Sequence, residues 1–202
     1  MSRIIGIVDY GISGNVHSIE KAIKKAGGDT IVVNHVEQFS HVDKLVLPGV
    51  GSFKDAMEEL DNHGFLKALQ KTTKPILGIC LGMQILSTIG FEYGETQGLG
   101  LIQGEVRPII VEAKVPHVGF NNIKIVKSNN ILDGLQNDEF YFMHSYEVVN
   151  SIDIASVTQY AGHKFVSSIK KDNIYGVQFH PEKSREPGIL LFKNFINLES
   201  HK

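Results

Sequence analysis

The chain of 202 residues contains one cysteine and no tryptophan, and its formal net charge is only −2. A single cysteine excludes an intrachain disulfide framework and is typical of proteins in a reducing compartment, so we expect a cytoplasmic location. The near-neutral charge gives no electrostatic reason to expect binding to nucleic acid or to an anionic membrane. No apolar run approaches the roughly 20 residues of a spanning helix, and the first apolar run is too short for a signal peptide.

The composition is that of an ordinary globular protein. Apolar residues make up 42% of the chain and charged residues 21%, which is enough apolar material for one sizeable core. The sequence shows no internal repeat, no low-complexity tract and no linker rich in Pro or Ser. We therefore expect residues 1–202 to form a single domain.

The first half of the chain alternates short apolar runs with amphipathic segments. Short runs of aliphatic and β-branched residues are typical of buried parallel strands, and the amphipathic segments predict helices that cover such a sheet on both faces. We expect strands at 3–10, 30–34, 44–49 and 76–80, and helices at 16–26, 53–60, 65–69 and 81–89.

The second half has the pattern of a mixed or antiparallel sheet. Its strand-like runs are separated by turn residues such as Ala161-Gly162 and Asp172-Asn173,. We expect strands within 105–111, 121–126, 139–149, 154–169 and 173–180, and a closing amphipathic helix at 188–198. The predicted fold class is therefore α/β, with a mostly parallel mixed sheet, helices on both faces and antiparallel strands in the second half.

The only cysteine, Cys80, lies in the motif GICLGMQ at the end of a predicted strand. Open α/β sheets carry their sites at the carboxyl ends of strands, and the flanking glycines Gly78 and Gly82 permit a sharp strand-to-helix turn. The start of a helix favours a thiolate at such a position. Free cysteine is equally common as an inert core residue, so this motif alone leaves both interpretations open.

A nucleophilic cysteine needs a base, and the base needs a group that orients it. Of nine histidines, His180 differs because it ends an apolar strand in the motif IYGVQFHPE. Pro181 fixes the backbone beyond it, and Glu182 is near enough to reach back and accept a hydrogen bond from the imidazole. A solvated His and Glu at a strand end would give the same pattern, but a strand-end cysteine on the same sheet favours the catalytic interpretation.

Acyl transfer also needs donors for a developing oxyanion. The backbone N–H of Leu81, directly after the cysteine, is well placed by its position. A second donor must come from another loop, and the glycine-rich segment LPGVGSF at 47–53 follows the third predicted strand. Taken alone, that segment is equally an ordinary turn between a strand and a helix.

Three motifs in a fixed order, LPGVGSF, GICLGMQ and GVQFHPEKS, resemble class I (triad-type) glutamine amidotransferases. They span nearly the whole chain, and the resemblance implies a flavodoxin-like α/β fold. Within the family, the segments DYG, VPHVGFNN, FYFMHSY and HPEKS are most similar to glutaminase subunits of imidazole glycerol phosphate synthase.

The resemblance implies hydrolysis of L-glutamine to glutamate and ammonia. Cys80 would be the nucleophile that forms a γ-glutamyl thioester, His180 the base and then the acid, and Glu182 the residue that orients His180. This chemistry needs no metal and no cofactor.

The resemblance also assigns binding positions. The backbone N–H of Leu81, with that of Val50 or Gly51, would form the oxyanion hole. Gln84 and the backbone at Ser145-Tyr146 would bind glutamine.

The resemblance further implies a protein partner. Ammonia would pass to a cyclase subunit, a (β/α)8 barrel, in a heterodimer that makes imidazole glycerol phosphate and AICAR ribonucleotide in histidine biosynthesis. Residues 116–121, Asn15 and Lys183 would lie near the junction. No nucleic acid or membrane is expected as a partner.

Two features depart from the pattern of these subunits. The segment DYGISGN carries one extra residue, which is expected to displace Asn15, and Phe120 stands where tryptophan is usual. Both concern the partner side, so a paralogue that feeds another synthase, such as a sugar-modifying amidotransferase, stays an alternative. A cysteine hydrolase acting on another γ-glutamyl or peptide substrate, and a non-catalytic subunit, are two further alternatives. The complete Cys80, His180 and Glu182 set argues against the last.

Overall fold

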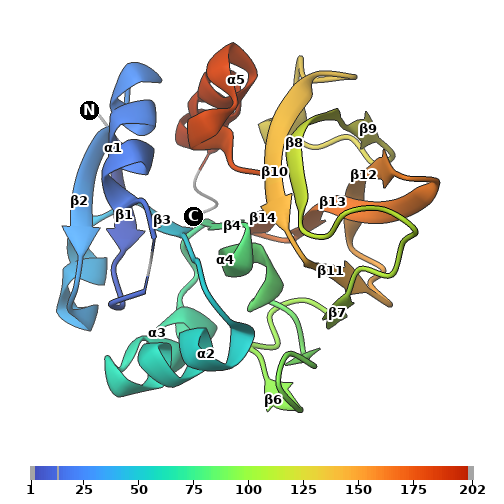
Figure 1. Cartoon of the computed structure of the whole chain (residues 1–202). Coiled ribbons are helices and arrows are strands. Elements are labelled where there is room, and N and C mark those ends of the chain that lie inside the picture. Colours follow the sequence, from blue (N-terminus) through green and yellow to red (C-terminus); the bar gives the residue numbers. More distant parts are fainter. Residues whose placement is uncertain (1–2, 13, 200–202) are drawn as a thin grey trace.

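The computed structural model describes residues 3–12 and 14–199 and is built around one large twisted sheet (Figure 1). Five strands in its first part are parallel, and the remaining three continue it in antiparallel pairing. The order is β2 (Asp29–Val33), β1 (Ile4–Val8), β3 (Lys44–Leu47), β4 (Ile76–Ile79), β14 (Ile174–Val177), β13 (His163–Lys171), β12 (Ile154–Tyr160) and β9 (Lys124–Ile125).

Helices cover the parallel part of this sheet on both faces. Helices α1 (Val16–Lys25) and α5 (Arg185–Asn197) pack on one face, and α2 (Phe53–Asn62) and α3 (Phe65–Lys71) on the other (Figure 1). Each helix turns an apolar stripe inward, as Ile19 and Ile23 of α1 show. Two apolar cores result, one on each side of strands that are themselves almost wholly buried, which is why those strands read as continuous apolar runs.

Two smaller sheets lie beside the large one. One is the antiparallel pair β10 (Glu139–His144) and β8 (His117–Asn122), and the other has the order β11 (Tyr146–Val149), β7 (Glu105–Pro108), β5 (Ile89–Gly90) and β6 (Thr96–Gln97). The short helices are α4 (Leu81–Gln84) and the 3-10 turns η1 (Val36–His41), η2 (Asn130–Leu132) and η3 (Pro181–Lys183).

The predicted fold class is confirmed, but the predicted helix at 81–89 is wrong. Helix α4 ends at Gln84, and the Thr88 N–H donates to the Gly104 carbonyl as the chain enters β5. Ile89 and Gly90 then pair with β7. Pairing with a distant strand therefore overrides the local apolar pattern, and sequence periodicity does not contain that information.

Other boundaries also differ from the sequence predictions. The strand predicted at 121–126 is two strands, because β8 ends at Asn122 and β9 begins at Lys124 around the buried Ile123. Helix α5 begins at Arg185 rather than Gly188, since proline in the first turn of a helix loses no hydrogen bond,. Strands β5 and β6 are only two residues long and have no sequence signal.

Across residues 3–12 and 14–199, no helix combines the length and the apolar character that crossing a membrane requires.

A buried lysine holds the end of α5 to the sheet. Lys44 on β3 is fully buried, and its Nζ donates to the carbonyls of Ile196 at 2.9 Å and Leu198 at 2.8 Å. Carbonyls at a helix C-terminus lack intrahelical partners and carry partial negative charge, so an ammonium group satisfies both needs. Lys44 therefore acts as an internal cap that fixes α5 against the strand.

We expect Lys44→Met to lower the free energy of unfolding by about 2 to 3 kcal/mol, because two buried carbonyls lose a charged donor. Urea denaturation followed by circular dichroism measures the change. The control is Lys71→Met at an exposed position, expected to change stability by less than about 0.5 kcal/mol. Equal effects of the two substitutions would contradict the capping role.

Candidate active site

Cys80 occupies a strained turn at the carboxyl end of β4. Its backbone has φ 54° and ψ −112°, a conformation that side chains rarely adopt,. The turn passes so close to the neighbouring chain that a Cβ at Gly82 would collide with the Leu47 carbonyl, and one at Gly78 would lie 2.6 Å from the Gly82 carbonyl oxygen. The two glycines predicted to permit a sharp turn are therefore required, and the turn projects Cys80 from the edge of the sheet.

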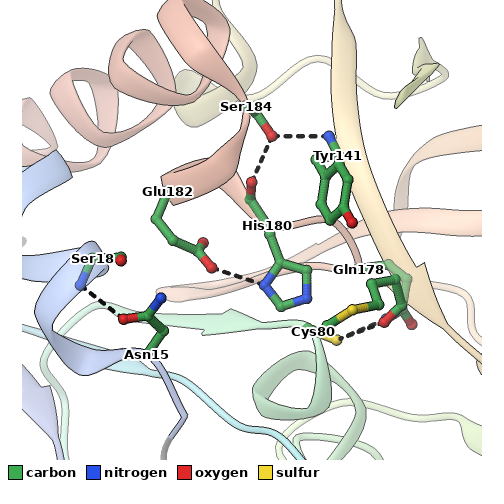
Figure 2. A network of polar contacts seen from close by, with 9 residues as sticks. Asn15, Ser18, Cys80, Tyr141, Gln178, His180, Glu182 and Ser184 are labelled. Carbon is green, nitrogen blue, oxygen red and sulfur yellow. Dashed lines mark hydrogen bonds and ion pairs between the residues drawn. The ribbon is translucent and has the colours of Figure 1, made fainter. Parts of the chain in front are cut away.

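The parallel pairing of β4 with β14 brings His180 to the same edge. Ile79 pairs with Val177, and the Cys80 N–H donates to the Val177 carbonyl at 2.8 Å. His180 follows Val177 by three residues, and its ring lies between Glu182 on one side and Cys80 on the other (Figure 2). The sequence prediction that these three side chains converge agrees with this arrangement.

Glu182 holds the imidazole as the sequence predicted. His180 Nδ1 lies 2.9 Å from Glu182 Oε1, and the two side chains are only 5% and 2% exposed. Such a buried carboxylate places the proton on Nδ1 and directs Nε2 toward the cysteine. In the described part of the chain, Nε2 is buried and makes no hydrogen bond of standard geometry, so it is free to exchange a proton with a substrate.

The backbone of His180 is fixed by β10. The His180 N–H donates to the Tyr141 carbonyl at 2.8 Å, and the hydroxyl of Ser184 donates to the His180 carbonyl. The Tyr141 N–H in turn donates to Ser184 Oγ at 3.0 Å (Figure 2). This closed set of bonds holds the base in place before substrate arrives, and the sequence analysis did not identify Ser184.

Electrostatics favour a charged imidazole in the folded protein. Burial by itself lowers the pKa of His180, but its interactions with the Cys80 sulfur and the Glu182 carboxylate outweigh burial and raise that pKa to about 10. Because the pKa is raised, the proton stays on His180 through the neutral range and leaves only at alkaline pH. A thiolate beside an imidazolium is the arrangement that activates a cysteine nucleophile.

Cys80 and His180 line a cavity of about 500 Å³. This size is ordinary for a small-molecule site. All the predicted site residues line it except Glu182, which lies behind His180: Val50, Gly51, Cys80, Leu81, Gln84, Ser145, Tyr146 and His180. Residues from four separate segments therefore meet in one cavity, as the sequence analysis expected.

The sequence analysis missed one residue of the cavity wall and one buried residue behind Cys80. Glu92 supplies a carboxylate to the wall, and its Oε2 accepts from the Phe53 N–H at 2.7 Å. Gln178, which is fully buried, donates from Nε2 to Cys80 Sγ at 3.7 Å. Gln178 stands inside the quoted motif GVQFHPEKS, so its position was visible, but only the fold shows that it faces the sulfur.

The predicted oxyanion donors differ in their availability. The Leu81 N–H begins α4 and so has no acceptor within the helix,. The Val50 N–H instead donates to the Ile12 carbonyl at 3.4 Å. Gly51 has φ +91°, and a side chain there would meet no neighbouring atom, so Gly51 can present its backbone to the cavity.

The predicted partner-side residues lie near one another at this edge. Asn15 accepts from the Ser18 N–H and caps α1, and it lines a small cavity together with Glu182 and Lys183. The extra residue of DYGISGN was expected to displace Asn15; position 13 of that segment lies outside the described residues. Phe120 is 39% exposed on β8, with the Arg185 guanidinium 4.5 Å from its ring centroid.

Within the ranges 3–12 and 14–199, no group of three or more His, Cys, Asp or Glu side chains is arranged to hold a metal ion.

Comparison with known proteins decides the family. The family model described as glutamine amidotransferase class-I matches residues 7–198. The chain belongs to this family. Two curated members with similar sequences are subunits HisH of imidazole glycerol phosphate synthase: that of Campylobacter jejuni is 43% identical and covers 96% of this chain and 100% of its own length, and that of Aquifex aeolicus is 43% identical and covers 94% of each.

A solved structure shares the fold of this chain. A chain of the PurLQS structure from Thermotoga maritima has a TM-score of 0.75 to this chain, with 18% identity, and the match covers 98% of this chain and 99% of that one. At that identity the likeness concerns the fold alone.

We expect the His180 ring of this amidotransferase to remain an imidazolium from about pH 6 to about pH 8, because its pKa is raised well above the usual value near 6.5,. The ¹⁵N chemical shifts of the ring report its charge. Cys80→Ala removes the sulfur that raises the pKa, so the ring should then lose its proton at lower pH.

The control is Ser156→Ala on β12, whose hydroxyl bonds to Ser167 and Ser168 of β13, and this variant should keep the wild-type titration. A wild-type ring that titrates near its usual value would contradict the ion pair.

Proposed function

We propose that this chain is the glutaminase subunit of an imidazole glycerol phosphate synthase. The observation that carries the proposal is the convergence of Cys80, His180 and Glu182 on the cavity, in a chain about 43% identical over nearly its full length to subunits HisH. In this role it releases ammonia from glutamine for a cyclase partner in histidine biosynthesis. The single cysteine supports a cytoplasmic location.

The first half-reaction forms an acyl-enzyme. The Cys80 thiolate attacks the carboxamide carbon of glutamine, a carbon–sulfur bond forms, and the electron pair of the C=O bond moves onto oxygen. When this intermediate collapses, the carbon–nitrogen bond breaks and the His180 imidazolium gives its proton to the departing amine, releasing ammonia. Glu182 stabilises the imidazolium and keeps its Nε2 directed at the reacting atoms.

The second half-reaction restores the enzyme. Neutral His180 takes a proton from water, the resulting hydroxide attacks the γ-glutamyl thioester, and the carbon–sulfur bond breaks to release glutamate. Leu81 and Gly51 supply the N–H donors for the oxyanion in both halves. The Val50 N–H can contribute only if it leaves the Ile12 carbonyl, and each well-placed donor contributes about 3 to 4 kcal/mol to transition-state stabilisation.

The rest of the cavity suits the other end of glutamine. Gln84 and the Ser145-Tyr146 backbone line the wall beyond Cys80, where backbone groups and the Gln84 side-chain oxygen can meet the polar atoms of the substrate. The Glu92 carboxylate is placed to pair with the α-ammonium group. A ligand with an acylated α-amine would lose that pairing, which favours free glutamine over a peptide.

The partner is proposed to bind a docking face on the β8–β10 sheet. Alternate residues of these strands face outward, where Val118, Phe120 and Met143 are exposed and Tyr141 is half-buried, and cations border the apolar centre. We define the docking face as Val118, Phe120, Tyr141, Met143, Lys183 and Arg185. Exposed apolar groups gathered on one face mark an interaction surface, and Met143 also lines the cavity. Ammonia released at Cys80 therefore has a short path to a bound (β/α)8 cyclase.

A paralogue that serves another synthase is the second candidate. The residues that favour it are on the docking face, since Phe120 stands where tryptophan is usual in subunits of the histidine pathway. The triad and the cavity are the same for both candidates, so only the partner distinguishes them.

Cys80→Ala should reduce glutamine hydrolysis by at least about 10,000-fold, since removal of a nucleophile leaves only the binding contributions. Glutamate release measures it. Ammonium salt added to the Cys80→Ala variant with its cyclase should restore formation of imidazole glycerol phosphate, because the variant lacks only its source of ammonia. Retained glutaminase activity would refute the role of Cys80, and a failure of ammonium to rescue would refute simple ammonia delivery.

The histidine-pathway cyclase should stimulate glutamine hydrolysis by this chain. Phe120→Asp should weaken binding to that cyclase by about ten-fold or more, because it places a charge at the centre of the docking face. The matched control is Ile152→Asp, an exposed apolar residue elsewhere that is 77% accessible, and it should bind normally. If the cyclase gives no stimulation while a sugar-modifying synthase does, the paralogue is the correct assignment.

A further inference from the structure

Two buried histidines lie beneath the docking face, and one of them, His144, also lines the glutamine cavity. His117 of β8 and His144 of β10 are directly paired across the two strands, and both are nearly inaccessible. Their rings are 5.5 Å apart, with His117 Nδ1 3.4 Å from His144 Nε2. The mechanism of glutamine hydrolysis does not use them. The sequence motifs and the triad do not explain why two imidazoles are buried here.

The hydrogen bonds fix the proton positions in this pair. His144 Nδ1 lies 2.9 Å from the Tyr146 carbonyl. A carbonyl can only accept, so Nδ1 carries the hydrogen and Nε2 of the same neutral ring must accept. His117 then donates from Nδ1, which leaves its Nε2 to accept from Asn121 Nδ2 at 3.4 Å. A single direction of donation therefore runs from Asn121 to the Tyr146 carbonyl.

The charge state required by this chain of bonds agrees with the environment. Burial lowers the pKa of His117. Burial also lowers the pKa of His144, to about 4; the nearby His117 and His180 lower it further, and the hydrogen bond to the Tyr146 carbonyl acts in the opposite direction. Both rings are thus neutral at pH 7. Only neutral rings can accept at one nitrogen and donate at the other.

The chain of bonds ends on atoms of the proposed substrate site. The Tyr146 carbonyl also accepts from Gln84 Nε2 at 3.0 Å, and the same Nε2 donates to Gln178 Oε1 at 3.0 Å. Gln178 donates in turn to the sulfur of Cys80 at 3.7 Å. An unbroken line of polar contacts therefore joins β8 to the nucleophile, and the Ser145-Tyr146 segment lies in the middle of it.

We propose that Asn121, His117 and His144 form a relay of positioning residues that fixes the Tyr146 carbonyl and with it the glutamine-binding segment. This inference rests on the proposed function. The relay runs on the inner side of β8, directly beneath the docking face, so strand β8 carries both. None of its members touches the reacting atoms, and its effect is on how well the cavity is shaped for glutamine.

Packing alone does not explain the two imidazoles. The rings stack among Phe142, Tyr160 and Phe165, where phenylalanine would fill the same space without any polar atom to satisfy. Buried nitrogens persist in an apolar cluster at a cost unless each is hydrogen-bonded. A complete set of donors and acceptors indicates selection for the position of the carbonyl at its end.

Matched substitutions separate hydrogen bonding from ring packing. His144→Phe keeps the ring and loses the donor, whereas His144→Asn loses the ring but keeps an amide nitrogen near the place of Nδ1. The Kd for glutamine is measured by calorimetry in the Cys80→Ala background, and KM and kcat are measured in the complex with the cyclase. His144→Phe should raise Kd and KM about ten-fold with kcat changed less than about two-fold, and His144→Asn should recover most of the loss.

His117→Phe, alone and combined with His144→Phe, tests whether the two histidines act in series. His117→Phe should raise the Kd several-fold, and the double variant with His144→Phe should be no worse than His144→Phe alone, because the second ring then has nothing to support. The control is Phe165→Leu, which changes the packing of the same cluster and should leave the Kd for glutamine unchanged.

Three outcomes would overturn the relay while leaving the glutaminase assignment intact. They are equal effects of Phe and Asn at position 144, independent effects of the two Phe substitutions that multiply, and a Phe165→Leu effect as large as that of His144→Phe. If the Cys80→Ala background binds no glutamine at all, the proposed function itself fails and the relay fails with it.

Discussion

The pairing of β4 with β14 is the contact on which the rest of the site depends. These strands are far apart in sequence and parallel in the sheet, with Ile79 beside Val177. Their carboxyl ends reach the same edge, so a cysteine after one and a histidine after the other meet without any long or mobile segment. This arrangement requires the parallel strands to stay in register. The helices, the two apolar cores and the Lys44 cap hold them there.

Strain at the cysteine is maintained by the same scaffold. A positive φ at a residue with a side chain is unfavourable and persists only where the surroundings enforce it. Here the Cys80 N–H is bonded to β14, and the glycines before and after it let β3 and α4 approach closely. The nucleophile is therefore held in position by backbone contacts, and its side chain stays available for chemistry.

The sequence was sufficient for the fold class and for much of the candidate site, and the reasons are physical. Buried parallel strands leave continuous apolar runs, and motifs at strand ends mark one edge of a sheet, so Cys80, His180 and Glu182 could be named beforehand. Pairing between distant segments leaves no local trace. For that reason the helix predicted at 81–89 is in fact α4 followed by β5, and the roles of Ser184, Gln178 and the relay histidines required coordinates.

The local sequence also does not show that alternate residues of β8, on the partner side, face two different environments. One set of its residues faces outward on the docking face, and the other reaches the histidines beneath it. The single thiol of the chain lies at the far end of that connection, open to the cavity. A thiol-specific reagent small enough to enter the cavity would therefore label this protein at one known atom, and a fluorophore carried there would register events at the opposite strand without any engineered cysteine.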